Sequence, residues 1–157
     1  MIKTILRKHV LFVTLLCLVN VALPAQPPKQ WDKRFGGTAV DQLNSLLQTA
    51  DGGYILGGQS NSGISGDKTV DSWGSFDYWV VKIDANGVKQ WDKRFGGTDE
   101  DFLLSLQQTA DFGYILGGYS NSGIGGDKTE GVLGLQDYWV VKIDANGIKQ
   151  WDKRFGG

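Results

Sequence analysis

A repeat of 60 residues governs what this chain can fold into. Residues 30–89 are followed by a second copy at 90–149, and a third copy starts at residue 150. The two full copies differ at 15 positions and agree at 45, with no insertion or deletion. Each copy is therefore expected to form one supersecondary unit, and neighbouring units are expected to complete each other's hydrophobic core.

The first 25 residues have the composition of a secretory signal peptide. Three basic residues precede an apolar run over 10–21, and Ala-Leu-Pro-Ala follows at 22–25. The run is shorter than the roughly 20 apolar residues of a membrane-spanning helix, so a membrane anchor is the weaker interpretation. The sequence predicts cleavage after Ala25 and a secreted or cell-surface protein. Its mature part, residues 26–157, is expected to lack a transmembrane segment.

Removal of that segment also removes His9 and Cys17, the only histidine and the only cysteine. Residues 26–157 then cannot form a Ser-His-Asp or Cys-His catalytic site, a His-ligated zinc site or a disulfide. They carry 13 Lys and Arg against 17 Asp and Glu. This acidic balance argues against nucleic acid as a partner, because nucleic-acid binding calls for a basic surface.

Each copy contains the pattern of four strands separated by turns. In the first copy the predicted strands span 41–49, 54–60, 78–84 and 88–95, and a long loop spans 61–77. The third strand has the clearest alternation, which places one set of side chains on each face: Trp79, Val81 and Ile83 against Tyr78, Val80 and Lys82. The residues 30–35 and 149–155 are predicted to form strands of the fourth type.

Glycines and turn residues mark the connections. The Asn86-Gly87 pair predicts a hairpin turn between the third and fourth strands. At the tight turn over 51–53, Phe112 of the second copy matches Gly52, so Gly53 is predicted to be the residue with positive φ. The glycines at 57 and 58 predict a close approach of another backbone.

Tryptophans recur at matching positions in the strands, at 31, 79, 91, 139 and 151. Their regular placement favours aromatic packing between adjacent sheets over a carbohydrate-binding platform. We expect Trp79 and Trp139 to be buried between sheets and Trp73, in the long loop, to be more exposed.

The pattern of four antiparallel strands with two short turns and one long loop matches a β-propeller blade. The predicted fold class is all-β: two four-stranded antiparallel propeller-blade-like repeats, which form an incomplete β-propeller after the signal peptide. A closed ring takes about 4 to 8 blades. The sequence therefore predicts either a fragment of a longer array or a small protein that covers its edges by self-association.

The repeated pattern resembles a known group of exported proteins. The sequences Trp-Asp-Lys-Arg-Phe-Gly-Gly at 31–37, Gln-Thr-Ala-Asp-Gly-Gly-Tyr-Ile-Leu-Gly-Gly at 48–58 and Asp-Tyr-Trp-Val-Val-Lys-Ile-Asp-Ala-Asn-Gly at 77–87 carry the resemblance. They are similar to the secreted, propeller-like repeat proteins of gliding, type IX secreting Gram-negative bacteria. The resemblance implies an extracellular or surface-attached repeat array, without known catalytic activity in most members. Longer members carry more repeats and a C-terminal sorting domain, so the resemblance leaves the export route of this chain open.

The long loop holds the candidate binding residues. It contains 7 of the 15 positions that differ between the copies, and variation gathers where strand packing does not dictate the residue. The aromatic Trp73, with Asp67 and Asp77, forms a candidate site for a glycan or a small molecule. Candidate Ca²⁺ ligands are the loop aspartates of both copies, Asp67, Asp77, Asp127 and Asp137. Aspartates in loops also cap turns by binding their own backbone, and no other cofactor is predicted.

The expected function is structural, adhesive or protein-interacting, without catalysis. The alternative is a glycan or small-molecule binding module that uses the long loops. A carboxylate-based glycoside hydrolase is the third hypothesis, and it is disfavoured because near-identical copies supply similar environments where catalysis needs two different ones. The expected partners are neighbouring repeats, further copies of the chain, or a surface protein or glycan.

Overall fold

The computed structural model describes residues 29–157, which form two four-stranded antiparallel sheets and contain no helix. The first sheet has the order β1 (Asp41–Gln48), β2 (Tyr54–Ser60), β3 (Asp77–Ile83) and β4 (Lys89–Phe95). The second has the order β5 (Asp101–Gln108), β6 (Tyr114–Ser120), β7 (Asp137–Ile143) and β8 (Lys149–Phe155). The all-β class and the two antiparallel sheets related by the 60-residue shift are thus confirmed. The predicted signal peptide lies outside the described residues.

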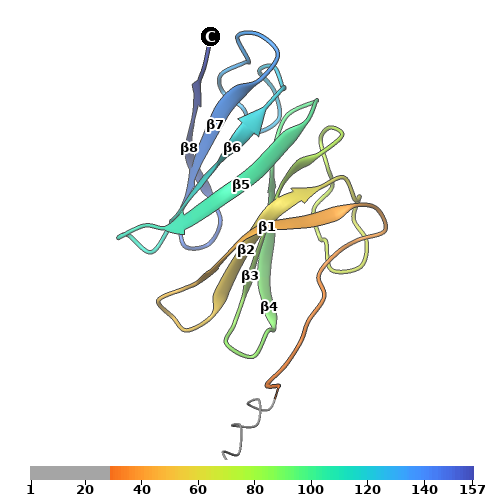
Figure 1. Ribbon diagram of the computed structural model, residues 1–157, viewed down its shortest axis with the longest axis vertical. Helices are drawn as coiled ribbons and strands as arrows, with labels where there is room; N and C mark the ends of the chain where they lie inside the picture. Colours follow the sequence, from red (N-terminus) through yellow and green to blue (C-terminus); the bar gives the residue numbers. More distant parts are fainter. Residues whose placement is uncertain (1–28) are drawn as a thin grey trace, which may run out of the picture.

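Each sheet is an up-and-down meander, as Figure 1 shows. The two short turns of a sheet lie at one end of its strands, and the long loop between its second and third strands lies at the other end. Among residues 29–157, no helix is long and apolar enough to cross a membrane. The predicted strand bounds differ from the observed ones by one residue at several ends, as in β3, which starts at Asp77.

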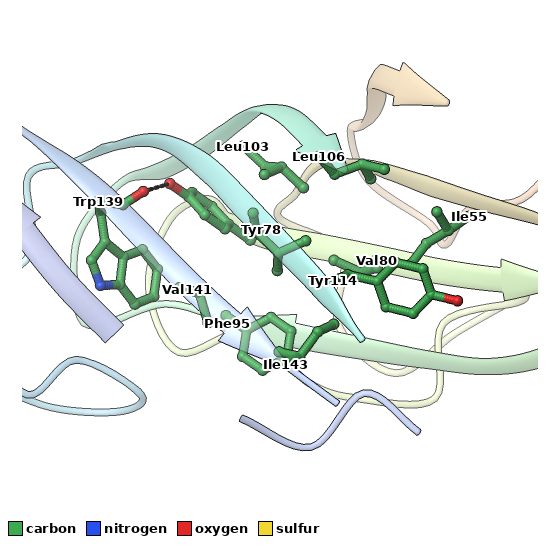
Figure 2. Packing of buried hydrophobic residues seen from close by; sticks show 11 residues of the cluster. Ile55, Tyr78, Val80, Phe95, Leu103, Leu106, Tyr114, Trp139, Val141 and Ile143 are labelled. Carbon is green, nitrogen blue, oxygen red and sulfur yellow. Dashed lines mark hydrogen bonds between the residues drawn. The ribbon is translucent and has the colours of Figure 1, made fainter. Parts of the chain in front are cut away.

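The two sheets pack face to face, and the main hydrophobic core lies between them (Figure 2). The first sheet contributes Ile55, Tyr78, Val80 and Phe95, and the second contributes Leu103, Leu106, Tyr114, Leu116, Trp139, Val141 and Ile143. The alternation predicted for the third strand is confirmed, because a separate cluster of Trp79, Val81 and Ile83 lies on the opposite face of the first sheet. We call the contact between the two sheets the inter-sheet interface.

The inter-sheet interface joins unlike faces of the two copies. The first sheet presents the face that bears Tyr78, whereas the second presents the face that bears Trp139. Trp139 is therefore buried between sheets as predicted. Trp79 is also buried, but the prediction that it lies between sheets is wrong, since it packs beneath Phe35 and Val70 instead. The reason is that the described residues hold no sheet before the first one.

Residues 31–37 lie where the fourth strand of a preceding sheet would lie. The strand predicted over 30–35 is not formed, because no third strand is present beside it. The segment nevertheless repeats the contacts of residues 91–97. Trp31 meets the ring of Tyr54 edge-on at 6.0 Å, as Trp91 meets Tyr114 at 6.3 Å.

The tight turn between the first two strands corrects one prediction. Positive φ occurs at Gly52 (81°) and at its counterpart Phe112 (62°), and not at Gly53. Gly53 is required for a different reason, because a Cβ there would lie 2.3 Å from the carbonyl oxygen of Ile83. The predicted close approach at the paired glycines is confirmed at Gly58, where a Cβ would lie 1.7 Å from the carbonyl oxygen of Gln42.

Candidate functional site

Two of the aspartates predicted as ligands tie the long loops to the segment before each sheet. The backbone N–H of Asp67 donates to the carbonyl of Gly36 at 2.9 Å, and its Oδ2 accepts from the N–H of Gly36 at 3.2 Å. Asp127 makes the same pair of bonds with Gly96, at 2.8 and 3.3 Å. Each aspartate thus binds the first segment of its own copy, which precedes the sheet.

The other two aspartates are the first residues of β3 and β7, and both are buried. Oδ2 of Asp77 accepts from the backbone N–H of Trp73 at 2.6 Å. Oδ2 of Asp137 accepts from that of Leu133, also at 2.6 Å. Each carboxylate therefore closes the end of its own long loop.

The calcium hypothesis for these four aspartates stays a prediction. Within residues 29–157, no group of three or more acidic, histidine or cysteine side chains has the arrangement of a metal site. Melting temperatures with and without Ca²⁺ would test the hypothesis directly, because an ion that binds only the folded state stabilises it by an amount that grows with the logarithm of the ion concentration above Kd.

Charged residues from both copies meet at Gly96, and we call this group the junction cluster: Asp77, Arg94, Asp101, Asp127 and Lys128. A Cβ at Gly96 would lie 1.9 Å from Oδ1 of Asp77 and 2.9 Å from Oδ2 of Asp101. Nη1 of Arg94 lies 3.9 Å from Oδ2 of Asp127. The structure thus brings Asp77 of the first copy beside Asp127 of the second, whereas the sequence analysis had grouped Asp77 with Asp67.

The junction cluster contains buried polar atoms without hydrogen-bond partners in the described part of the chain. They are Oδ1 of Asp77, Oδ1 of Asp101, Nε of Arg94 and Nζ of Lys128. The counterpart Lys68 donates to Oγ of Ser72 at 2.8 Å, but valine replaces that serine at position 132. Lys128 instead lies over the ring of Trp139, 4.5 Å from its centroid, which partly offsets the loss.

Burial moves the titration of this cluster toward the neutral forms. It raises the pKa of Asp77 to about 6, against the opposing effect of the hydrogen bond from Trp73. Burial likewise raises the pKa of Asp101 and of Asp127 and lowers the pKa of Lys128. Because Asp77, Asp101 and Lys128 are buried, these pKa shifts bear on the pH dependence of stability.

Trp73 lies on the junction between the copies. Its side chain is 57% exposed, and the guanidinium of Arg94 lies 4.5 Å from its ring centroid. The neighbouring Phe76 fixes this part of the loop, since its carbonyl accepts from the N–H of Asp101 at 2.7 Å and its ring stacks on Phe102 at 5.5 Å. Of the three predicted ligand-binding residues, Trp73 alone is exposed, because Asp77 is buried and Asp67 is half-buried.

A groove of about 300 Å³ lies on the outer face of the first sheet. Residues that line it include Phe35, Leu43, Leu56, Gly58, Trp79 and Val81. The sequence analysis missed this feature because it looked for sites in the loops. The signal was present, since Leu43, Leu56 and Trp79 match Leu103, Leu116 and Trp139, which are buried in the inter-sheet interface.

Comparison of the chain with known protein families and with curated proteins finds no match.

Proposed function

We propose that the protein is a secreted, non-catalytic repeat scaffold with a structural, adhesive or protein-interaction role. In this proposal each four-stranded sheet is a blade of an incomplete β-propeller. The meander order of each sheet and the stacking of equivalent strands through unlike faces support it. Export by the type IX route belongs to the same proposal and rests on the resemblance of the repeated pattern.

The observation that carries the proposal is the contrast between the base and the tip of the long loops. At the base, both loops keep the same buried or half-buried groups, such as the pairs Ser62 and Ser122, Lys68 and Lys128. At the tip, the sequences diverge over residues 70–76 and 130–136. A conserved support that carries different exposed side chains is the arrangement expected of a scaffold that presents loops.

The proposal is tested by replacing the loop tips while the sheets are left intact. One variant carries Ser at Asp71, Leu133, Leu135 and Gln136, which are exposed, and beads coated with it are compared with beads coated with the wild type for retention on cells of the producing organism. Loss of retention, with an unchanged β-sheet circular dichroism spectrum, is expected. Equal retention would contradict loop presentation, and turnover in a screen of chromogenic glycosides would contradict the non-catalytic part.

A second candidate function is glycan or small-molecule binding at Trp73. The observation that favours it is an exposed indole next to a guanidinium, a combination that suits stacking against a sugar or another planar group. A glycan array probed with the wild type and with Trp73→Ala tests it, and Leu133→Ala at the matching position of the second copy is the control. Binding that survives Trp73→Ala would rule out this site.

A further inference from the structure

The inter-sheet interface has two halves, and each copy carries both halves in its sequence. One half is the face with Tyr78, Val80 and Phe95, which belongs to the first sheet. The other is the face with Leu103, Leu106 and Trp139, which belongs to the second sheet. The counterparts of all six residues in the other copy are identical in type. Each sheet therefore also carries, on its outer side, the half that the interface does not use.

Large apolar side chains of the unused halves are exposed, although Trp79 itself is buried beneath Phe35 and Val70. Tyr78 is 0% exposed, but its counterpart Tyr138 on the outer face of the second sheet is 73% exposed. Leu103 is 0% exposed, but its counterpart Leu43 on the outer face of the first sheet is 54% exposed. Phe155 and Leu46 follow the same pattern. Apolar faces of this kind are unusual on a monomer and mark places where another surface docks.

The groove on the first sheet is equivalent to the site on the second sheet in which the Tyr78 side chain lies. In the inter-sheet interface, the ring of Tyr78 lies 4.9 Å from that of Trp139, and its hydroxyl donates to the carbonyl of Trp139 at 2.9 Å. Gly118 makes room for it, since a Cβ there would lie 2.8 Å from the hydroxyl oxygen. The groove offers Trp79 and Gly58 at the matching positions.

We propose that a second copy of this chain docks on the groove through the outer face of its second sheet, with Tyr138 of the incoming copy inserted beside Trp79. A second copy of this chain is the expected occupant because its outer face carries the residue types that fill the inter-sheet interface. Tyr138, Val140 and Phe155 match Tyr78, Val80 and Phe95. The contact is heterologous, since it joins unlike faces. Successive copies can therefore add head to tail, and they end in a ring or a filament.

Docking requires a local rearrangement at the start of the repeats. Residues 31–37 have the same sequence as residues 151–157, and they cover the groove as residues 91–97 cover the second sheet. In the complex, β8 of the incoming copy takes their place. The segment belongs to neither sheet, so its displacement breaks no ladder of backbone hydrogen bonds. It gives up the bonds of Gly36 with Asp67 and of Trp31 Nε1 with the carbonyl of Ala85, which the identical residues Gly156 and Trp151 of the incoming chain can make in its place.

The contact between two chains is expected to be weaker than the inter-sheet interface within one chain. The stacked pair Phe76 and Phe102 is replaced by Gln136 and Gln42, which are amides able to bond each other. Asn44, whose Nδ2 donates to the carbonyl of Leu103 at 2.7 Å, is replaced by Leu104. We therefore expect association that depends on concentration and not a permanent oligomer.

Two charge substitutions, one on each outer face, test the proposal by sedimentation velocity. Wild-type protein is expected to form species larger than a monomer at about 100 µM. Leu43→Arg blocks the groove and Tyr138→Arg blocks the incoming face, and each variant alone is expected to associate about 100-fold more weakly or worse. Ile124→Arg, which places the same charge in an exposed loop, is the control and is expected to behave as wild type.

Mixing the two blocked variants gives the decisive result. Each retains one intact face, so the mixture is expected to form a one-to-one heterodimer and nothing larger. A mixture that stays monomeric, or a wild type that stays monomeric at about 100 µM, would overturn the proposal. Because both substituted residues are exposed in the monomer, the variants are expected to keep the wild-type circular dichroism spectrum, which is checked first. A single blocked variant that still forms dimers would show that like faces pair, and would also overturn it.

Discussion

The hydroxyl of Tyr78 donates a hydrogen bond across the inter-sheet interface to the backbone carbonyl of Trp139, at 2.9 Å. Tyr138, the same residue one repeat later, faces no sheet within residues 29–157 and is exposed. Tyr78→Phe is expected to destabilise the protein by about 1 to 2 kcal/mol, because it leaves a buried carbonyl without this donor. Tyr138→Phe is expected to change the free energy of unfolding by close to zero. Urea denaturation of dilute protein measures both, and equal effects would contradict the assigned interface.

The leucine pair at positions 43 and 103 provides a test of packing that involves no polar group. Leu103→Ala removes a fully buried side chain and is expected to cost about 2 to 5 kcal/mol. Leu43→Ala alters an exposed side chain at the same position of the repeat and is expected to stay within about 0.5 kcal/mol under dilute conditions. Thermal or urea melts compare them. A cost of similar size at both positions would mean that the first sheet is also covered in solution.

The turn over 51–53 makes a prediction that separates two kinds of glycine. Gly52→Ala places a side chain at φ 81° and is expected to cost about 1 kcal/mol, since Phe112 already tolerates the same conformation. Gly53→Ala is expected to cost more, because its Cβ meets the backbone of Ile83, which cannot move away without disturbing β3. If Gly52→Ala were the more damaging change in urea melts, the turn would have another conformation.

Stability is expected to rise as the pH falls from about 7 to 5. The folded pKa of Asp77 lies at about 6, above its ordinary value of 3.8, so the folded state binds a proton that the unfolded state does not bind in this range. The shift corresponds to about 3 kcal/mol of destabilisation above pH 6 from Asp77 alone. Asp101 and Asp127, with pKa values raised by burial, add in the same direction.

Stability is expected to fall again below pH 4. Hydrogen bonds lower the pKa of Asp51, chiefly from Lys82, and that of Asp111, chiefly from Thr109, to about 2. The stability that these two carboxylates contribute is present above pH 3.8 and is lost as the pH falls through 2. Urea melts from pH 2 to pH 8 measure the profile, and Asp77→Asn is expected to flatten it between pH 5 and 7. An unchanged slope in Asp77→Asn would assign the effect to other groups.

The fold was largely predictable because repetition and alternation are local signals. The alternation of Trp79, Val81 and Ile83 with Tyr78 and Val80 depends only on strand geometry, and both sets lie in the expected opposite clusters. The predicted position of positive φ at the tight turn is wrong, because Phe112 adopts the positive φ that the sequence assigns to Gly53. Comparison of the two copies does not distinguish a glycine that is needed for its positive φ from one that is needed because no room exists for a Cβ.

The candidate sites were less predictable because they depend on which copies meet. Asp77 and Asp127 are 50 positions apart in the sequence, and only the stacking of the sheets places both beside Gly96. The groove was not predicted for a similar reason, since Leu43 and Leu103 occupy the same position of the repeat but have opposite exposure. The exposure of a side chain in a repeat protein depends on whether a neighbouring repeat covers it, and the sequence of a single repeat does not give this information.

We infer that the outer face of the second sheet is one half of a further inter-sheet interface, with the other half absent from residues 29–157. The most direct test is the cost of Tyr138→Phe in a protein extended after Gly157 by a further copy of residues 98–157. A third sheet should then cover Tyr138, and the cost of Tyr138→Phe in urea denaturation should rise from near zero to the value for Tyr78→Phe, about 1 to 2 kcal/mol. A cost that stays near zero, although circular dichroism shows the added copy to be folded, would contradict the claim.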